Sequence, residues 1–164
     1  MATTGFAERV AFGRVVDPLR DENQAFAAPR PGTMLAGRFL LAAIFFVSGY
    51  AKLTDPAGTI AHMTAAGIPA ADVLAYVAGF AEILGAVSLL FGFLTRIGAL
   101  GLILFMIPTT LVFHNFWAYE GAEQRMQLVN FLKNLGILGG LSLLVACGAG
   151  RYSVDSKLRW PNPP

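Results

Sequence analysis

The sequence predicts an all-α membrane protein: a polytopic four-helix bundle with a short interfacial helix between the first two spans and both termini in the cytoplasm. Two observations support this prediction. The 164-residue chain is 55% hydrophobic and only 13% charged, and its mean hydropathy of +0.60 lies above the usual range of soluble domains. Four stretches are also long enough to cross a bilayer, whose hydrocarbon core needs about 20 apolar residues in a helix.

The charge distribution divides the chain into three parts. Residues 1–33 form a polar tail without an apolar core, which excludes a cleavable signal peptide and leaves room for some helix over residues 4–16. Residues 150–164 form a short basic tail. We place both tails in the cytoplasm, because nine of the 12 Lys and Arg residues lie on their side of the membrane. Between them lies the transmembrane domain, residues 34–149, with spans at about 33–53, 73–93, 97–119 and 127–149.

The first span carries polar side chains near both ends. Thr33 can cap its start, and Ser48 and Lys52 lie one turn apart near its outer end, so their side chains share a face. Arg38 lies within its first turns. Because a long basic side chain at that depth can reach the headgroups, we expect Arg38 to anchor the span at the cytoplasmic surface.

The chain then breaks and restarts as a short helix. Asp55 suits an N-cap and Pro56 a first helical position. The helix that follows, over residues 57–66, ends at Gly67 and is too short to span a bilayer, so we place it in the membrane interface. We expect His62, which lies on this helix, to contact solvent or lipid headgroups.

The second span is almost entirely apolar and contains one carboxylate. Asp72 can cap its start, and Glu82 lies about midway along its 21 residues. An ionisable group at that depth costs roughly 2.5–3.5 kcal/mol, so it needs a partner or a water-filled site. Glu82 therefore indicates that polar side chains face it from neighbouring spans.

The third and fourth spans supply candidate partners. Arg96, at the start of the third span, is a second expected anchor at the cytoplasmic face. Pro108 should kink this span, and His114 lies near its outer end. A polar connection over residues 118–126 leads into the fourth span, one side of which carries Asn130, Lys133 and Asn134.

Every span thus places a polar group in the outer half of the bundle. We expect Glu82 to be the buried acceptor there, with Lys133 or Lys52 as its cation, in a cluster formed by Ser48, Lys52, Glu82, His114, Asn130, Lys133 and Asn134. If a cation reaches Glu82 the carboxylate stays ionised, and if none does it is protonated; the sequence leaves both states open. Buried pairs of this kind also hold bundles in register, and that structural role is the alternative to a ligand or proton site.

The composition excludes several classes of function. A single cysteine, Cys147, rules out an internal disulfide and dithiol redox chemistry, and its apolar surroundings predict a buried side chain. Two histidines on separate segments fall short of a metal site or a bis-histidine haem, and no nucleotide-binding motif is present. A net charge of +2 without a basic run argues against nucleic acid. We expect no metal and no covalent cofactor, so an electron carrier would be a dissolvable one such as a quinone, or would belong to a partner.

Five segments in chain order carry recognisable signatures: GRFLLAAIFFVSGYAKLTDP, the short helix with GIP, FAEILGAVSLLFGFLTRIGAL, FHNFWAYEG and FLKNLGILGG. They resemble successive signatures of the DoxX family of small four-helix membrane proteins, over about residues 34–155. The resemblance implies a multi-pass protein of the bacterial inner membrane whose polar signature is Gly49, Lys52, Glu82, Arg96, His114, Lys133 and Asn134. The wider group includes a subunit of thiosulfate:quinone oxidoreductase, although most members have no assigned reaction. The tail before Met34 is longer than the typical pattern.

We therefore expect a polar pocket in the periplasmic half of the bundle that accepts a small molecule or a quinone-like headgroup, in an accessory subunit of a membrane redox system. Two alternatives stay open. One is a non-enzymatic scaffold or assembly protein whose ion pairs only fix helix register, and the other is a small proton-coupled transporter, which at this length would act as an oligomer. The expected partners are the lipid bilayer, a redox-enzyme subunit and further copies of the chain. The sequence identifies no catalytic residue and does not decide whether the protein is an enzyme.

Overall fold

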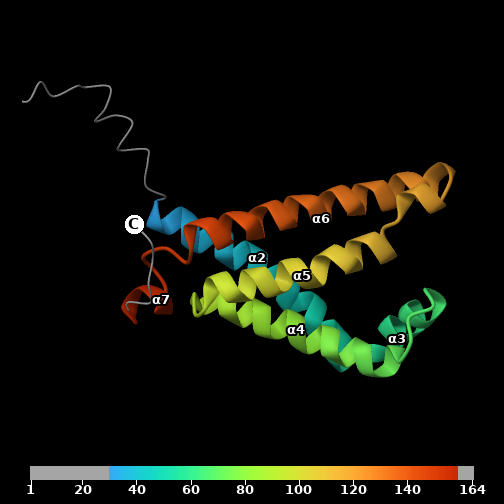
Figure 1. The fold of residues 1–164 in the computed structure, drawn as a ribbon, viewed down its shortest axis with the longest axis horizontal. Helices are drawn as coiled ribbons and strands as arrows, with labels where there is room; N and C mark the ends of the chain where they lie inside the picture. Colours follow the sequence, from blue (N-terminus) through green and yellow to red (C-terminus); the bar gives the residue numbers. More distant parts are fainter. Residues whose placement is uncertain (1–29, 159–164) are drawn as a thin grey trace, which may run out of the picture.

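The computed structural model describes residues 30–158, and the regular structure of this part is helical throughout. In chain order, the elements are α2 (Pro31–Thr54), α3 (Pro56–Ala65), α4 (Ala71–Phe91), α5 (Thr95–Phe113), the 3-10 turn η1 (Phe116–Ala118), α6 (Gly121–Cys147) and α7 (Val154–Lys157), as shown in Figure 1. The helix expected over residues 4–16 lies outside the described residues, as does most of the polar tail.

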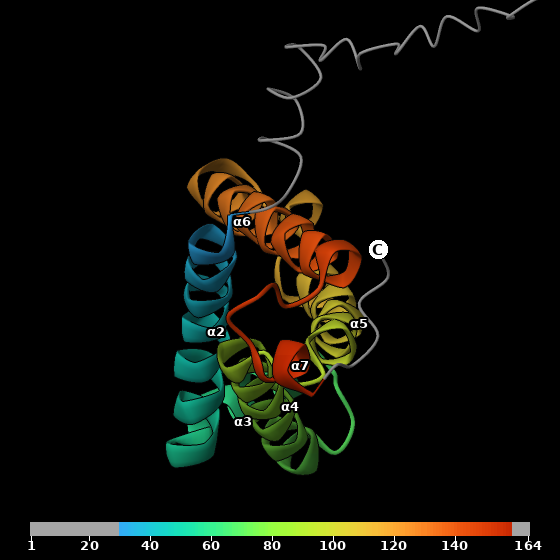
Figure 2. The ribbon, with the colours of Figure 1, turned by 90° about the vertical axis from the view of Figure 1, so that its left-hand side faces the viewer.

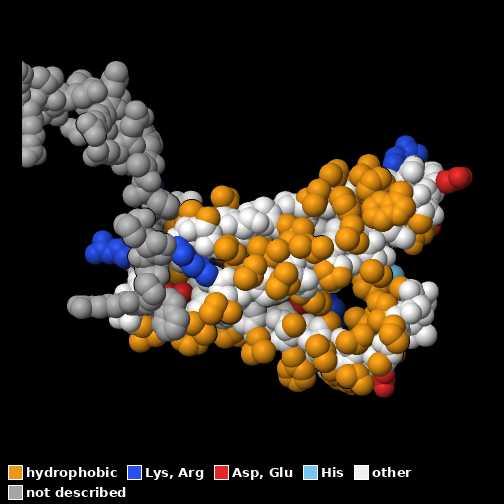
Figure 3. Space-filling model, viewed as in Figure 1, with side chains coloured by type: hydrophobic (Ala, Val, Ile, Leu, Met, Phe, Trp, Pro, Cys, Tyr) orange, Lys and Arg blue, Asp and Glu red, His pale blue; other side chains and the backbone are white. Residues whose placement is uncertain are grey.

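Four segments are long and apolar enough to cross a membrane: α2, α4, α5 together with η1, and α6. Their outward surfaces are hydrophobic, as Figure 3 shows, and Val47, Leu84 and Leu143 are each 67–68% exposed. Water would penalise a surface of this kind, whereas lipid chains are as apolar as the side chains themselves. The predicted all-α four-helix membrane architecture is confirmed.

Both ends of the transmembrane domain lie at the same end of the bundle. Figure 1 shows α2 beginning and α6 ending at this end, which we call the inner end. The short helix α7 lies across it, in front of the helix ends in Figure 2. The opposite end, which we call the outer end, carries α3. The first and last residues of α3 each lie within one residue of those predicted for the short helix.

The α3 helix packs on α4. Its Met63 is buried in a cluster with Ala71, Ala75 and Ala78 of α4. His62, which was expected to contact solvent or headgroups, is exposed but also stacks on Phe113 of α5, with ring centroids 4.8 Å apart. The outer end is therefore held by contacts of α3 with two spanning helices.

Two glycines bring α2 and α4 close together. A Cβ atom built on Gly49 would lie 2.8 Å from the carbonyl oxygen of Gly79, and one built on Gly79 would lie 2.8 Å from the Leu53 side chain. Neither position has room for a side chain. The two helices therefore approach through their backbones, as small residues allow in membrane helices.

The α6 helix is buried only near the inner end. Its buried residues are Leu141 and Leu144, which join a core with Ala42, Phe45, Ala86, Leu89, Ala99, Leu102 and Met106. The outer half of α6 runs beside α5, as Figure 1 shows, and contributes no buried residue. The bundle is thus tightly packed at its inner end and open on the α6 side at its outer end.

One predicted helix boundary was wrong. The fourth long helix begins at Gly121 instead of 127, because residues 121–126 include good helix formers whose polarity suits an exposed first turn. The third span reaches Ala118, close to its predicted end, although α5 itself ends at Phe113 and the chain turns at His114 before η1. Pro108 lies inside α5, which continues as a helix on both sides of it.

Two of the three expected N-caps lie two or three residues from the observed ones. The N-cap of α2 is Arg30 instead of Thr33, with a proline at the first helical position. Asp72 lies in the first turn of α4, after the cap, where a carboxylate interacts favourably with the helix dipole. Asp55 does occupy the N-cap of α3, without a capping hydrogen bond from its side chain.

Candidate functional site

Three of the predicted residues form a hydrogen-bonded group between α2 and α4, which we call the Glu82 triad: Ser48, Lys52 and Glu82. The Lys52 Nζ atom lies 2.9 Å from Oε2 and 3.2 Å from Oε1 of Glu82, and it donates to Ser48 Oγ over 2.6 Å. Ser48 Oγ in turn donates to Glu82 Oε1 over 3.2 Å. The side chains of Lys52 and Glu82 are 20% and 6% exposed, so the ion pair is largely withdrawn from the surface.

Helix periodicity and the glycine contact explain how the triad forms. Ser48 and Lys52 lie four residues apart on α2 and therefore share a face. Gly49 meets Gly79 of α4, and Glu82 follows Gly79 by three residues on the same face of α4. The close backbone approach thus sets the distance at which the Lys52 amine meets the carboxylate. Three donor contacts to one carboxylate offset much of the cost of burying it.

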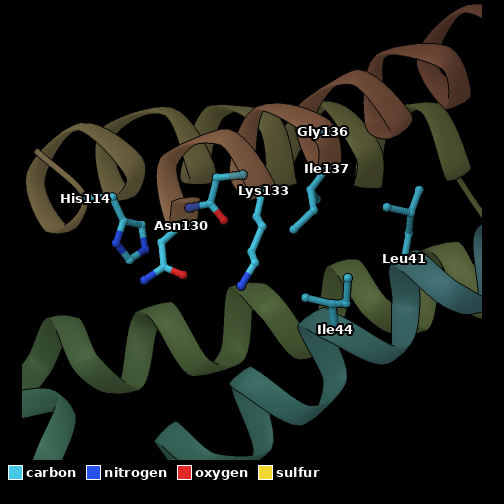
Figure 4. Close-up of a pocket in the computed structure, with 8 residues that line it drawn as sticks. Leu41, Ile44, His114, Asn130, Lys133, Gly136 and Ile137 are labelled. Carbon is cyan, nitrogen blue, oxygen red and sulfur yellow. The ribbon is translucent and has the colours of Figure 1, made fainter. Parts of the chain in front are cut away.

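A second group of predicted residues lines an open cleft of about 650 Å³, which we call the polar cleft. Its lining residues come from α2, α6 and the end of α5: Leu41, Ile44, His114, Asn130, Lys133, Asn134, Gly136 and Ile137. In Figure 4, His114, Asn130 and Lys133 point from one side toward the opposite helices, and Leu41 and Ile44 lie on α2. The lining is polar toward the outer end and apolar toward the inner end.

The polar cleft and the Glu82 triad lie next to each other. Ile44 lines the cleft, and Ser48 follows one turn later on the same face of α2. Figure 3 shows acidic and basic atoms inside a hollow whose rim is hydrophobic, between the outer halves of α5 and α4. The triad therefore lies one turn further along α2 than the cleft lining and contributes no residue to it.

Two polar residues of the cleft are held by protein partners. His114 Nδ1 lies 3.0 Å from Gln127 Oε1, and Asn134 Nδ2 donates to Thr110 Oγ1 over 3.0 Å. Asn130 and Lys133 differ from them: within residues 30–158, neither forms a side-chain hydrogen bond, and Lys133 forms no ion pair. The cleft therefore contains one amide and one amine that are free to bind another molecule.

The single cluster predicted around Glu82 is divided in two. Of the two candidate cations, Lys52 pairs with Glu82, whereas the Lys133 amine points into the cleft (Figure 4). His114 and Asn134 bond to Gln127 and Thr110 instead of to Glu82. The physical reason is the position of α6, whose outer half packs beside α5 and stands apart from the Glu82 triad.

Comparison with known proteins identifies the family. The model of the DoxX family matches residues 33–115, a region that includes the Glu82 triad and His114. The chain belongs to the DoxX family. It is 31% identical to inner membrane protein YphA of Escherichia coli over 132 residues, which are 80% of this chain and 94% of YphA. It is 38% identical to inner membrane protein YqjF of the same organism over 125 residues, or 76% of this chain and 91% of YqjF.

A shorter match reaches a eukaryotic protein. The chain is 38% identical to the ER-derived vesicles protein ERV29 of Saccharomyces cerevisiae over 77 residues, which are 46% of this chain and 24% of ERV29. No solved structure matches the chain. The two bacterial relatives and the four spanning helices confirm the predicted localisation: this DoxX protein is a multi-pass protein of the bacterial inner membrane.

In this DoxX protein, Arg38 binds the protein's own carboxyl-terminal segment. Its side chain is 1% exposed, and Nη1 and Nη2 donate to the carbonyl oxygens of Ala149 and Tyr152 over 2.7 and 2.6 Å. The expectation that Arg38 reaches lipid headgroups is therefore wrong, because the chain folds back over it after α6. Arg96, the second expected anchor, donates to the carbonyl oxygen of Ala146 over 3.0 Å.

Residues 149–158 form what we call the carboxyl-terminal clasp, which the sequence analysis described only as a tail. Asp155 is 7% exposed, and its two carboxylate oxygens accept from the backbone N–H groups of Leu94 and Thr95 over 2.7 and 3.0 Å. Its own N–H donates to the carbonyl oxygen of Gly92 over 2.9 Å. One carboxylate thus caps α5. The available signal was Ser153, which caps α7 and is followed by an acid in the first turn.

The predicted cluster did not include two residues that bond to polar side chains of the cleft. Thr110 and Gln127 hold two cleft residues, and their spacing was readable, since Thr110 precedes His114 by four residues and Gln127 precedes Asn130 by three. Cys147, which was expected to be buried, is exposed. Within residues 30–158, no group of three or more His, Cys, Asp or Glu side chains gathers in a way that could hold a metal.

Proposed function

We propose that the protein binds a small amphiphile with a quinone-like headgroup in the polar cleft, as an accessory subunit of a membrane redox system. The observation that supports this most is the composition of the cleft, where free donors on Asn130 and Lys133 lie beside the apolar side chains of Leu41, Ile44 and Ile137. A quinone headgroup carries carbonyl oxygens that accept hydrogen bonds, and its attached chain is apolar. The volume of about 650 Å³ also lies within the usual range of small-molecule sites.

The position of the cleft suits a ligand that is dissolved in the bilayer. The cleft lies between α2 and the outer half of α6, which contributes no buried residue. A lipophilic molecule can approach such an opening from the lipid phase without crossing a polar surface. Its headgroup would meet the amine and the amide, and its chain would lie against the apolar part of the lining.

The proposed link to a redox system rests on membership of the DoxX family. The wider DoxX group includes a subunit of thiosulfate:quinone oxidoreductase, and in an equivalent role this chain would hold a quinone while a partner subunit exchanges electrons with it. Chemical cross-linking in native membranes, followed by identification of the attached proteins, tests this part of the proposal. Recovery of a membrane oxidoreductase subunit would support it, and recovery of further copies of the chain alone would count against it.

Filling the cleft tests ligand binding directly. Gly136 lines the cleft, and a Cβ atom built there meets no atom within 4 Å, so a side chain can leave the backbone there without a clash and Gly136→Leu adds bulk to the cleft. Gly101, on the exposed surface of α5, has equally open surroundings, which makes Gly101→Leu a matched control. Titration of purified protein with a short-chain ubiquinone analogue should give affinity that falls at least about tenfold in Gly136→Leu and stays unchanged in Gly101→Leu. Equal affinity in both variants would contradict the proposal.

A second candidate function is a membrane scaffold whose buried ion pair fixes helix register. The Lys52–Glu82 pair favours it, because the pair joins α2 and α4 beside the contact between Gly49 and Gly79. In this case Glu82→Gln would lower bundle stability and the recovery of partner proteins, and it would leave the affinity for any ligand unchanged. A change in quinone affinity in Glu82→Gln would favour the first function.

A further inference from the structure

We propose that the headgroup bound in the polar cleft carries a negative charge, so that the ligand is a lipophilic organic acid. This inference rests on the proposed function, which places a quinone-like amphiphile in the cleft. The new element is the negative charge of the bound molecule, which Lys133 would select.

Basic side chains outnumber acidic ones around the polar cleft. Among the charged residues of the Glu82 triad, Lys52 and Glu82 neutralise each other at 2.9 Å. Lys133 lines the cleft, and its lining contains no Asp or Glu. Within residues 30–158, no carboxylate pairs with Lys133. The cleft therefore carries an excess positive charge that no described acid compensates.

The depth of Lys133 makes this excess significant. Lys133 lies 12 residues after Gly121, and because the polar residues 121–126 precede the apolar part of α6, it lies about 9 Å into that part. A charged side chain at such a depth is unfavourable unless it is paired or hydrated. A basic residue near a helix end can extend to the headgroups, but the Lys133 amine points inward, toward the opposite helices (Figure 4). An anionic headgroup in the cleft would pair with it.

The neighbouring groups add directional donors to the charge. Asn130 precedes Lys133 by three residues, so the amide and the amine lie on one face of α6 and both point into the cleft (Figure 4). His114 completes the polar end, with its ring held at Nδ1 by Gln127. A headgroup with an ionised oxygen beside a carbonyl oxygen would satisfy the amine and the amide together.

Two quinones that differ in charge but hardly in shape test the effect of the ligand's charge on affinity. The probes are a 2-hydroxy-3-alkyl-1,4-naphthoquinone, which is ionised at neutral pH, and its 2-methoxy ether, which has nearly the same shape and no charge. Purified protein should bind the ionised compound roughly 10- to 100-fold more tightly than the ether, the range expected for one charge-assisted hydrogen bond. Lys133→Gln should remove this preference, and Lys133→Arg, which keeps the charge, should retain it. Arg125→Gln is the control, because Arg125 is an exposed cation in the first turns of α6.

The outcomes separate this inference from the function on which it rests. Equal affinity for both compounds in the unmodified protein would overturn the inference and leave quinone binding intact. Binding of neither compound would overturn both. A preference for the ionised compound that persists in Lys133→Gln, or that disappears in Arg125→Gln, would place the selecting charge outside the cleft and would also overturn the inference. Thermal unfolding of each variant shows whether the comparison is made between folded proteins.

Discussion

At the scale of single residues, Glu82 shows how a carboxylate can be kept inside a membrane bundle. Its side chain is 6% exposed, and it accepts from Lys52 and Ser48. Because both donors come from one face of α2, the carboxylate links two helices instead of bonding within its own. The same contacts explain why this group lies at the edge of the polar cleft without contributing a free acceptor to it.

Removing Lys52 should destabilise the protein more than removing the whole ion pair. In Lys52→Met, Glu82 remains buried with only Ser48 as a donor, and we expect a loss of up to about 3 kcal/mol, reduced by the 20% exposure of Lys52. In the double variant Lys52→Met with Glu82→Gln, no uncompensated charge remains, so part of this stability should return. Thermal unfolding in detergent micelles measures both effects. A double variant less stable than Lys52→Met alone would contradict this account.

The sequence was sufficient to find the members of the triad and insufficient to choose between two amines. Ser48 and Lys52 share a helix face through their spacing alone, and a lone carboxylate in an apolar span requires a partner. The choice between Lys52 and Lys133 depends on the separation of α6 from α4, which is set by packing between helices. No pattern within a single helix carries that information.

At the scale of elements, the contact between α2 and α4 depends on two glycines, and enlarging one of them should separate the helices. A Cβ atom at position 49 would lie 2.8 Å from the Gly79 carbonyl oxygen and 3.0 Å from the Glu82 Cβ. We expect Gly49→Ala to lower the free energy of unfolding by about 1–3 kcal/mol, as overpacking does elsewhere. Gly37→Ala is the control on the same helix, because a Cβ there meets no atom within 4 Å. Equal stability of both variants would rule out a close contact at Gly49.

The carboxyl-terminal clasp should depend on Asp155. Asp155→Ala removes the acceptor for two N–H groups at the start of α5, and we expect a loss of about 1–2 kcal/mol, as for other helix caps. It should also expose residues 149–158 to proteases, because the side chain of Asp155 joins the clasp to α5. Lys157→Ala, at an exposed position of α7, should behave like the unmodified protein. Cleavage in the clasp at the same rate in both variants would show that Asp155 does not hold it.

The number and order of the spanning helices followed from the sequence, whereas the start of α6 and the helix α7 did not. Apolar length alone predicts four spans, and the break at Asp55 and Pro56 predicts a short helix between the first two. The α6 helix begins six residues before the predicted position, because a helix that leaves the bilayer can be as polar as a connecting segment. The clasp was missed because it depends on Arg38, more than 100 residues away in the chain.

At the scale of the whole molecule, the two ends of the bundle differ in how they are packed. The inner end contains the larger buried core and is covered by the clasp, which is bound to Arg38 and to the start of α5. The outer end has a smaller core beneath α3 and leaves the polar cleft open beside α6. Movement of the outer half of α6 away from the bundle would therefore break few contacts between buried residues. This property suits a site that exchanges a ligand with the bilayer.

The orientation of this bundle in the membrane follows from its basic residues and can be tested. Arg96, Arg151 and Lys157 lie at the inner end, so the positive-inside rule predicts that this end faces the cytoplasm and that the cleft opens in the periplasmic half. Lys157→Cys and Ala122→Cys, each introduced into a Cys147→Ser background, place one exposed thiol at each end. A membrane-impermeant maleimide added to intact spheroplasts should label Ala122→Cys and not Lys157→Cys, and both should be labelled after detergent is added. The reverse pattern would mean that the cleft lies on the cytoplasmic side, where a ligand would arrive from the opposite leaflet.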